Sequence, residues 1–80
     1  MKLIDLVFRM NYTLVQGSLE QEISEVIYDS RKAVPGCIFL CMPGAVTDGH
    51  DYIPEVLEKG AAALVVEREV AVPKDVTVLR

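Results

Sequence analysis

Two uninterrupted apolar runs with a helical pattern between them constrain the fold of this chain more than any other feature. Residues 37–42 and 61–66 contain no polar side chain, which is typical of strands buried on both faces of a sheet. Residues 51–59 between them carry apolar side chains at helical spacing, and Gly60 provides a natural C-terminal stop. The order strand, helix, strand predicts a βαβ unit with two parallel strands.

The remaining segments add weaker elements around this unit. Apolar residues at helical spacing predict a short helix within residues 1–10, and residues 12–16 and 26–28 predict two brief strands. Residues 76–79 begin a further apolar strand. We therefore expect one small α/β domain over residues 1–80, with a small mostly parallel sheet flanked by two short helices.

The apolar strand at residues 76–79 has nothing after it in this sequence to cover its faces. This pattern indicates a fragment of a longer multidomain protein, and a terminal edge strand is the alternative. An exposed strand also supports a different class of function, a non-enzymatic α/β interaction module that binds a partner by strand addition.

The charge and hydropathy of the chain exclude several classes of function. The net charge is −4 and the eight basic residues are scattered, so no nucleic-acid-binding surface is expected. No apolar run approaches the roughly 20 residues that a transmembrane helix needs. Asp5 and Arg9 interrupt the apolar pattern near the start of the chain, which therefore does not read as a secretory signal. We expect a cytoplasmic protein.

Cys37 and Cys41 are predicted to be buried free thiols on one face of a strand. At about 3.3 Å per residue, their Cα atoms lie roughly 13 Å apart, which is too far for a disulfide. A metal site needs more ligands than these two, and the single histidine, His50, lies in a different loop. We therefore expect no metal site in this chain.

Polar residues follow two neighbouring strands at the points where the strands end. Residues 28–31 follow the first strand, and residues 48–50 lie beyond the second. Ligands of open α/β sheets bind at this edge, so the two loops predict a small-molecule site. The Ser30 hydroxyl can donate or accept a hydrogen bond, and Arg31 can pair with phosphate. The alternative, favoured on residue types alone, is that Asp29 and Ser30 cap a turn and Arg31 pairs with a carboxylate.

The second loop shares only its glycine spacing with a phosphate-binding loop. Gly44 and Gly49 are spaced as G-x-x-x-x-G, but His50 and Asp51 replace the lysine and the hydroxyl residue that bind the phosphates and Mg²⁺. We therefore reject a nucleoside-triphosphate site here. The loop still leads to a helix N-terminus, which favours an anion or a carbonyl-rich ring. The alternative is an ordinary connection, in which His50 or Asp51 caps the helix and Gly49 supplies a positive φ.

As a set of spaced motifs, these segments resemble the N-terminal domain of the Mur ligases, the ATP-dependent amino-acid-adding enzymes of peptidoglycan synthesis. The resemblance covers about half of the chain, roughly from Val26 to Glu67. The motifs are Asp29-Ser30-Arg31, Pro35-Gly36-Cys37-Ile38-Phe39, Gly44, Asp48-Gly49-His50-Asp51-Tyr52-Ile53 and Gly60-Ala61-Ala62. The amino-acid sequence of these motifs is most similar to that of the MurE type, UDP-N-acetylmuramoyl-tripeptide synthetase. The MurF type, which adds the D-Ala-D-Ala dipeptide, is the near alternative.

The resemblance implies that this domain binds the UDP moiety of UDP-N-acetylmuramoyl-L-alanyl-D-glutamate. It implies that Ser30 and Tyr28 contact the nucleotide, and that loop positions after Gly44 do so as well. Those loop residues are Ala45, Val46 and Thr47, while Arg31, Asp48 and His50 are further candidates. Of these, Asp48 and His50 are expected to shape the loop more than to touch the substrate.

The resemblance also implies that catalysis requires later domains of the same ligase chain. The family's ATP site, magnesium ligands and amino-acid pocket lie in those domains, so we assign no catalytic residue and no cofactor to this segment. The 80-residue fragment is expected to be inactive alone. Diaminopimelate and lysine stay equal candidates for the added amino acid.

Overall fold

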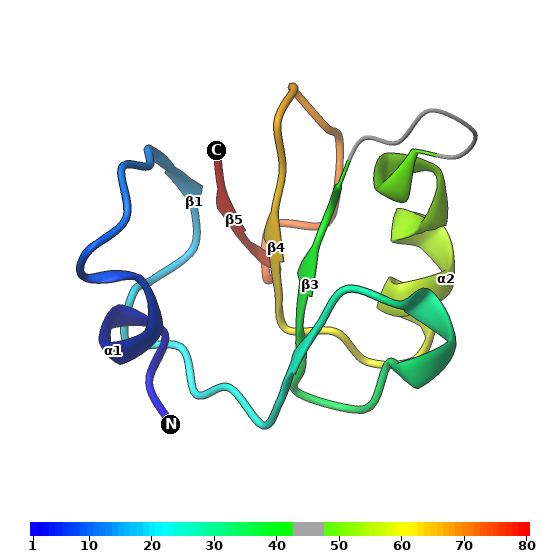
Figure 1. The fold of residues 1–80 in the computed structure, drawn as a ribbon, viewed down its shortest axis with the longest axis horizontal. Helices are drawn as coiled ribbons and strands as arrows, with labels where there is room; N and C mark the ends of the chain where they lie inside the picture. Colours follow the sequence, from blue (N-terminus) through cyan, green and yellow to red (C-terminus); the bar gives the residue numbers. More distant parts are fainter. Residues whose placement is uncertain (43–47) are drawn as a thin grey trace.

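The computed structural model describes residues 1–42 and 48–80, which form a five-stranded sheet with the order β1-β5-β4-β3-β2 (Figure 1). Strands β2 to β5 are parallel, and β1 is antiparallel to β5. The strands are β1 (Leu14–Gln16), β2 (Val26–Ile27), β3 (Ile38–Leu40), β4 (Ala63–Val65) and β5 (Thr77–Leu79). The helical elements are α1 (Leu3–Val7), α2 (Ile53–Glu58) and the 3₁₀ turns η1 (Ser30–Lys32) and η2 (Gly49–Tyr52). The predicted α/β class is confirmed.

The predicted βαβ unit forms between β3 and β4, where Phe39 lies opposite Leu64 in a parallel register. The connection begins differently from the prediction, because a 3₁₀ turn over 49–52 precedes the α-helix. Pro54 lies in the first turn of α2, where its missing N–H has no intrahelical partner to lose. Gly60 follows the helix with a φ of 95°, as expected for a C-terminal stop.

The predicted strands are all present, but each is shorter than its apolar segment. β3 covers three of the six residues in 37–42, and β4 covers three of the six in 61–66. A strand extends only as far as its neighbours pair with it, and β2 offers β3 just two residues. Of the apolar residues that flank these strands, Met42 is exposed, whereas four are buried without belonging to a strand: Cys37, Cys41, Ala61 and Val66.

Each face of the sheet is covered by one helix. Successive residues of a strand point to opposite faces. Phe39 therefore packs in the cluster that contains Val56 of α2, whereas Ile38 packs with Leu3 and Val7 of α1. Burial on both faces explains why the central runs contain no polar side chain. No helix among the described residues is long and apolar enough to cross a membrane.

The last strand of this sequence lies inside the sheet and not at its edge. β5 pairs with β4 on one side and with β1 on the other, and its three residues are buried. The expectation of an uncovered or edge strand is therefore wrong. The same finding removes the support for an interaction module, because the backbone groups of β5 are already paired on both sides.

Candidate functional site

A groove of about 620 Å³ lies at the carboxyl ends of β2 and β3, where the two polar segments were predicted to meet. One wall comes from residues 28–31 after β2, and the other from residues after β3 and at the start of α2. The lining residues are Tyr28, Asp29, Ser30, Arg31, Phe39, Met42, Gly49, Tyr52 and Glu55. A groove therefore lies at the sheet edge where ligands of open α/β sheets bind, and the binding of a small molecule there stays a prediction.

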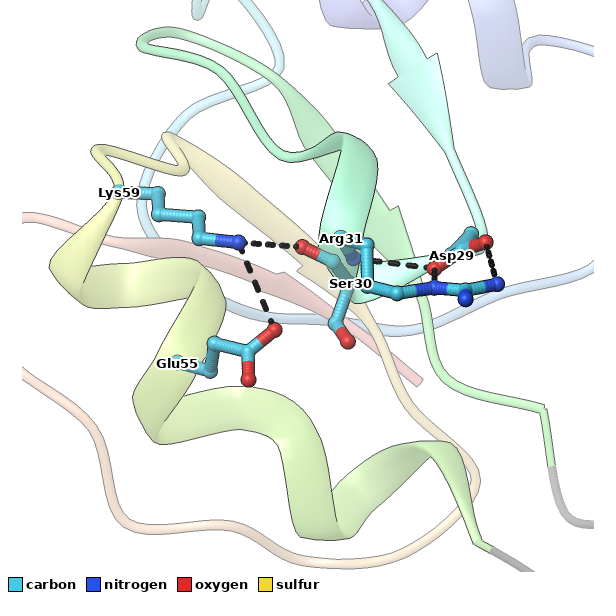
Figure 2. Close-up of polar contacts among 5 residues, drawn as sticks. All are labelled: Asp29, Ser30, Arg31, Glu55 and Lys59. Carbon is cyan, nitrogen blue, oxygen red and sulfur yellow. Dashed lines mark hydrogen bonds and ion pairs between the residues drawn. The ribbon is translucent and has the colours of Figure 1, made fainter.

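The turn η1 is held by Asp29 and Arg31. An Asp29 carboxylate oxygen accepts the backbone N–H of Arg31 at 3.0 Å, and the Arg31 guanidinium donates to both carboxylate oxygens at 3.0 and 2.8 Å. The Arg31 side-chain hydrogen bonds, with the backbone N–H second, lower the pKa of Asp29 to about 2. The turn-cap interpretation of Asp29 is confirmed, and the carboxylate partner of Arg31 is Asp29 itself (Figure 2).

Ser30 is the buried polar residue of this turn, with 8% of its surface exposed. Its carbonyl accepts the backbone N–H of Ala33 and the ammonium of Lys59, each at 3.2 Å. Its hydroxyl has no hydrogen-bond partner among residues 1–42 and 48–80, and Ser30 lines the groove. A hydroxyl that lies at a groove wall, without a partner among those residues, is available to donate to or accept from a ligand.

Aromatic and thioether side chains stand at the rim of the groove. Tyr28 is 74% exposed, Met42 is 59% exposed and Tyr52 is 37% exposed. Phe39 of β3 is buried and also lines the groove. Aromatic faces and a polarizable sulfur around a polar turn suit a planar ring that carries hydrogen-bonding groups.

Asp48 and His50 form a separate network behind the groove. One Asp48 oxygen accepts the backbone N–H of His50 at 2.9 Å and contacts its ring Nδ1 at 2.6 Å, and the other pairs with Arg68. The Arg68 hydrogen bond, followed by those of His50, holds the pKa of Asp48 well below its usual range. The backbone N–H of Glu67 donates to Nε2 of His50 at 3.0 Å, which places the ring proton on Nδ1.

This network connects η2 to the segment after β4, and both ring nitrogens of the buried His50 have hydrogen-bond partners. Neither Asp48 nor His50 is among the described residues that line the groove, and their expected role in shaping the loop stays a prediction. The predicted cap was wrong, because Asp48 caps η2 and neither His50 nor Asp51 does so. The candidates Ala45, Val46 and Thr47 lie outside the described residues.

Gly49 has a different role from the one predicted. Its φ is not positive, so conformational freedom does not explain the glycine. A Cβ at this position would lie 2.6 Å from the backbone nitrogen of Met42, and the N–H of Gly49 donates to the Met42 carbonyl at 3.0 Å. Gly49 is therefore needed because two backbone segments approach closely at the groove wall.

Neither a metal site nor a reactive thiol is found in the part of the chain that the structure describes. No group of three or more His, Cys, Asp or Glu side chains could hold a metal ion there. Cys37 and Cys41 are buried free thiols on the α2 face, as predicted. Burial, with the nearby Asp48 second, raises the pKa of Cys41 to about 11.

Sequence reasoning missed Met42, Tyr52 and Glu55 of the groove wall and Lys59 behind it. A weak signal exists for the last two, since Glu55 and Lys59 are spaced i, i+4 on the last turns of α2, but that spacing is common on solvent-exposed helix faces. Met42 and Tyr52 flank the second loop, and only the folded chain brings them beside residues 28–31.

Comparison with known proteins identifies the family to which the sequence of this chain is similar. The model of the Mur ligase family, catalytic domain, matches residues 22–79. A UDP-N-acetylmuramoyl-L-alanyl-D-glutamate--2,6-diaminopimelate ligase from Clostridioides difficile is 46% identical over 72 residues, which cover 90% of this chain and 15% of that protein. A UDP-N-acetylmuramyl-tripeptide synthetase from a Roseiflexus species is 56% identical over 46 residues, covering 58% of this chain and 9% of that protein.

Solved structures give the same result. MurF from Acinetobacter baumannii superposes with a TM-score of 0.64 at 30% identity, over 71% of this chain and 12% of that one. MurF from Thermotoga maritima, solved in complex with ADP, has a TM-score of 0.61 at 27% identity, over 74% of this chain and 13% of that one. The chain spans about 15% of the length of the curated relatives. The resemblance is confirmed, and this chain belongs to the Mur ligase family.

Proposed function

We propose that this chain is the N-terminal substrate-binding domain of an ATP-dependent Mur ligase and that its groove holds the UDP moiety of UDP-N-acetylmuramoyl-L-alanyl-D-glutamate. The observation that carries the proposal is the Ser30 hydroxyl. It lines a groove at the carboxyl ends of two parallel strands and has no hydrogen-bond partner among the described residues. A uracil carbonyl, a ring N–H or a phosphate oxygen would complete its hydrogen bonding.

The other groove residues would position the same ligand. The exposed ring of Tyr28 offers a face for the base or the sugar. The Arg31 side chain is 86% exposed while its guanidinium is paired with Asp29. It can therefore approach a diphosphate without giving up the ion pair with that carboxylate. Ala45, Val46 and Thr47 would add contacts through their backbone groups. Asp48 and His50 would act by holding the start of η2 in place.

The names of the relatives support the MurE type over the MurF type. The C. difficile relative is 46% identical over 90% of the chain, and its name states a dipeptide substrate and 2,6-diaminopimelate. The MurF structures reach 30% identity over 71% of the chain. We therefore propose that the complete enzyme adds 2,6-diaminopimelate to the UDP-linked dipeptide in peptidoglycan synthesis, in the cytoplasm. The MurF-type reaction is the alternative.

This domain binds and orients its ligand, and later domains of the same chain supply the catalytic groups. In those domains ATP would activate the terminal carboxylate of the substrate as an acyl phosphate, and attack of the amine on that carbonyl carbon would release phosphate. We assign no described side chain to that step, and no group of three or more described His, Cys, Asp or Glu side chains could hold a metal ion. The contribution of this domain is to hold the distant UDP end, which fixes the reacting end in the neighbouring site.

Substitution of Ser30 tests the proposal in the full-length ligase. Ser30→Ala is expected to weaken binding of UDP-N-acetylmuramoyl-L-alanyl-D-glutamate by about 1.5–3 kcal/mol if the hydroxyl meets phosphate, which is roughly tenfold to 150-fold in Kd. Ser24→Ala is the matched control, because the Ser24 hydroxyl donates to the Pro35 carbonyl at 2.7 Å and does not line the groove. Titration calorimetry measures both variants. An unchanged Kd and KM for Ser30→Ala would remove this residue from the site.

A further inference from the structure

The C-terminal end of α2 reaches across to the turn that carries Ser30. The Lys59 ammonium donates to the Ser30 carbonyl at 3.2 Å and lies 3.6 Å from a carboxylate oxygen of Glu55 (Figure 2). Lys59 is the residue that follows the last turn of α2, and it does not line the groove. Its ammonium is therefore engaged with the protein backbone and with Glu55 and is not presented to a ligand.

The backbone beside Lys59 is fixed against the segment that follows η1. The N–H of Gly36 donates to the Gly60 carbonyl at 2.8 Å. Gly60 also packs closely on Pro35, since a Cβ at this position would lie 3.0 Å from the Pro35 Cα. These contacts set the distance between α2 and η1, so the Lys59 side chain bridges a gap of defined length.

Ser30 is consequently held from two sides. Asp29 fixes the turn from within by accepting the Arg31 N–H, and Lys59 fixes the Ser30 carbonyl from α2. Within residues 1–42 and 48–80, Lys59 is the one side chain from another element that hydrogen-bonds to η1. The orientation of the Ser30 peptide sets the direction of its Cα–Cβ bond, and hence where the hydroxyl points in the groove.

We propose that Lys59 is a positioning residue for nucleotide binding, which acts through the Ser30 carbonyl to hold the Ser30 hydroxyl toward the ligand. The proposal rests on the proposed function, because it requires that the Ser30 hydroxyl binds substrate. Lys59 makes no ligand contact of its own. Its effect on binding therefore depends on the presence of the hydroxyl that it positions.

The first test removes the ammonium in the full-length ligase. Lys59→Met keeps most of the side-chain length and is expected to raise the Kd and KM for UDP-N-acetylmuramoyl-L-alanyl-D-glutamate about threefold to tenfold, with kcat at saturation unchanged. Lys59→Arg retains a donor and is expected to restore binding to within about twofold of the wild type. Lys74→Met is the control, because Lys74 is exposed and far from η1 along the chain. Wild-type Kd and KM in Lys59→Met would overturn the proposal.

A double-mutant cycle separates positioning from direct contact. In the Ser30→Ala background, Lys59→Met is expected to change the Kd less than twofold, because no hydroxyl remains to be positioned. A loss as large as in the wild-type background would mean that Lys59 acts independently of Ser30 and would overturn the inference. If Ser30→Ala weakens binding and Lys59→Met does not, the inference alone fails. If Ser30→Ala has no effect, the proposed role of Ser30 and this inference fail together.

Discussion

Replacement of Gly49 by alanine is expected to destabilise the domain through one close backbone contact. The added Cβ would lie 2.6 Å from the Met42 nitrogen and 3.1 and 3.2 Å from the Cα and carbonyl carbon of Cys41. These atoms are all backbone, so no flexible side chain can turn away. Either the chain leaving β3 moves, or the hydrogen bond from the Gly49 N–H to the Met42 carbonyl, 3.0 Å long, is stretched.

The size of the effect follows from opposing contributions. Overpacking of a rigid site costs about 1–3 kcal/mol, and a weakened hydrogen bond adds about 0.5–1.5 kcal/mol. The reduced entropy of the unfolded chain on replacing glycine returns about 0.4–1 kcal/mol, because the φ of Gly49 is one that alanine can adopt. A net loss of about 0.5–4 kcal/mol in the free energy of unfolding remains, with a central value of about 2 kcal/mol. For a domain of this size, a loss of about 2 kcal/mol lowers the melting temperature by roughly 8–16 °C.

Urea denaturation and thermal melts monitored by circular dichroism measure this loss. Asp51→Ala is the control, because Asp51 is exposed in the same turn and surface substitutions change stability by about 0.5 kcal/mol or less. Gly49→Asn discriminates the reasons for the glycine, since asparagine tolerates a positive φ but carries a Cβ. We expect Asn to be at least as damaging as Ala. Wild-type stability in Gly49→Ala, or in Gly49→Asn alone, would refute the close-contact explanation.

Two further predictions concern ionisation. The Asp29 carboxyl should titrate near pH 2 in carbon-detected NMR, and its pKa should move toward 3.8 in Arg31→Gln. Because the pKa of Asp29 is lowered in the folded protein, the ionised carboxylate stabilises the fold above about pH 4, and this stabilisation is lost as the pH falls toward 2. A titration midpoint near pH 3.8 for Asp29 in the wild type would contradict the pair of hydrogen bonds from the Arg31 guanidinium. Cys41, isolated in Cys37→Ser, should stay a thiol up to about pH 11 and react slowly with a disulfide reagent at pH 8 until the protein is unfolded. Because the pKa of Cys41 in the folded protein is raised above the ordinary thiol value of 9.0, the free energy of unfolding should fall between about pH 9 and 11. Rapid labelling of the folded protein at pH 8 would contradict the burial.

The parts of this fold that follow from local patterns were predictable. The runs at 37–42 and 61–66 are apolar because both faces of β3 and β4 are covered, and that burial leaves a direct trace in the sequence. Gly60 and Pro54 mark the ends of α2 through backbone geometry alone. The cap made by Asp29 was predictable for the same reason, because it involves residues two positions apart.

The parts that depend on distant contacts were not predictable. Nothing local in residues 76–79 indicates that β1 pairs with β5, so that strand looked uncovered. Gly49 looked like a residue with positive φ, because the backbone of Met42 beside it is visible only in the folded chain. Lys59 looked like an ordinary solvent-exposed lysine, since its acceptor, the Ser30 carbonyl, lies on another element.

β5 lies inside the sheet, so the folding of this domain depends on residues 77–79, which are synthesised after the other four strands. Leu14 lies opposite Leu79, and Leu79 also completes the cluster that contains Leu3 and Ile23 beneath α1. β1 therefore has no strand to pair with until β5 exists, whereas α1 can already pack against Ile38 of β3 and Ala63 of β4. Contacts between such distant residues form slowly, because the chain entropy is lost before the contacts are gained. A nascent chain is thus expected to complete its sheet, with β1 in place, only after β5 has left the ribosome.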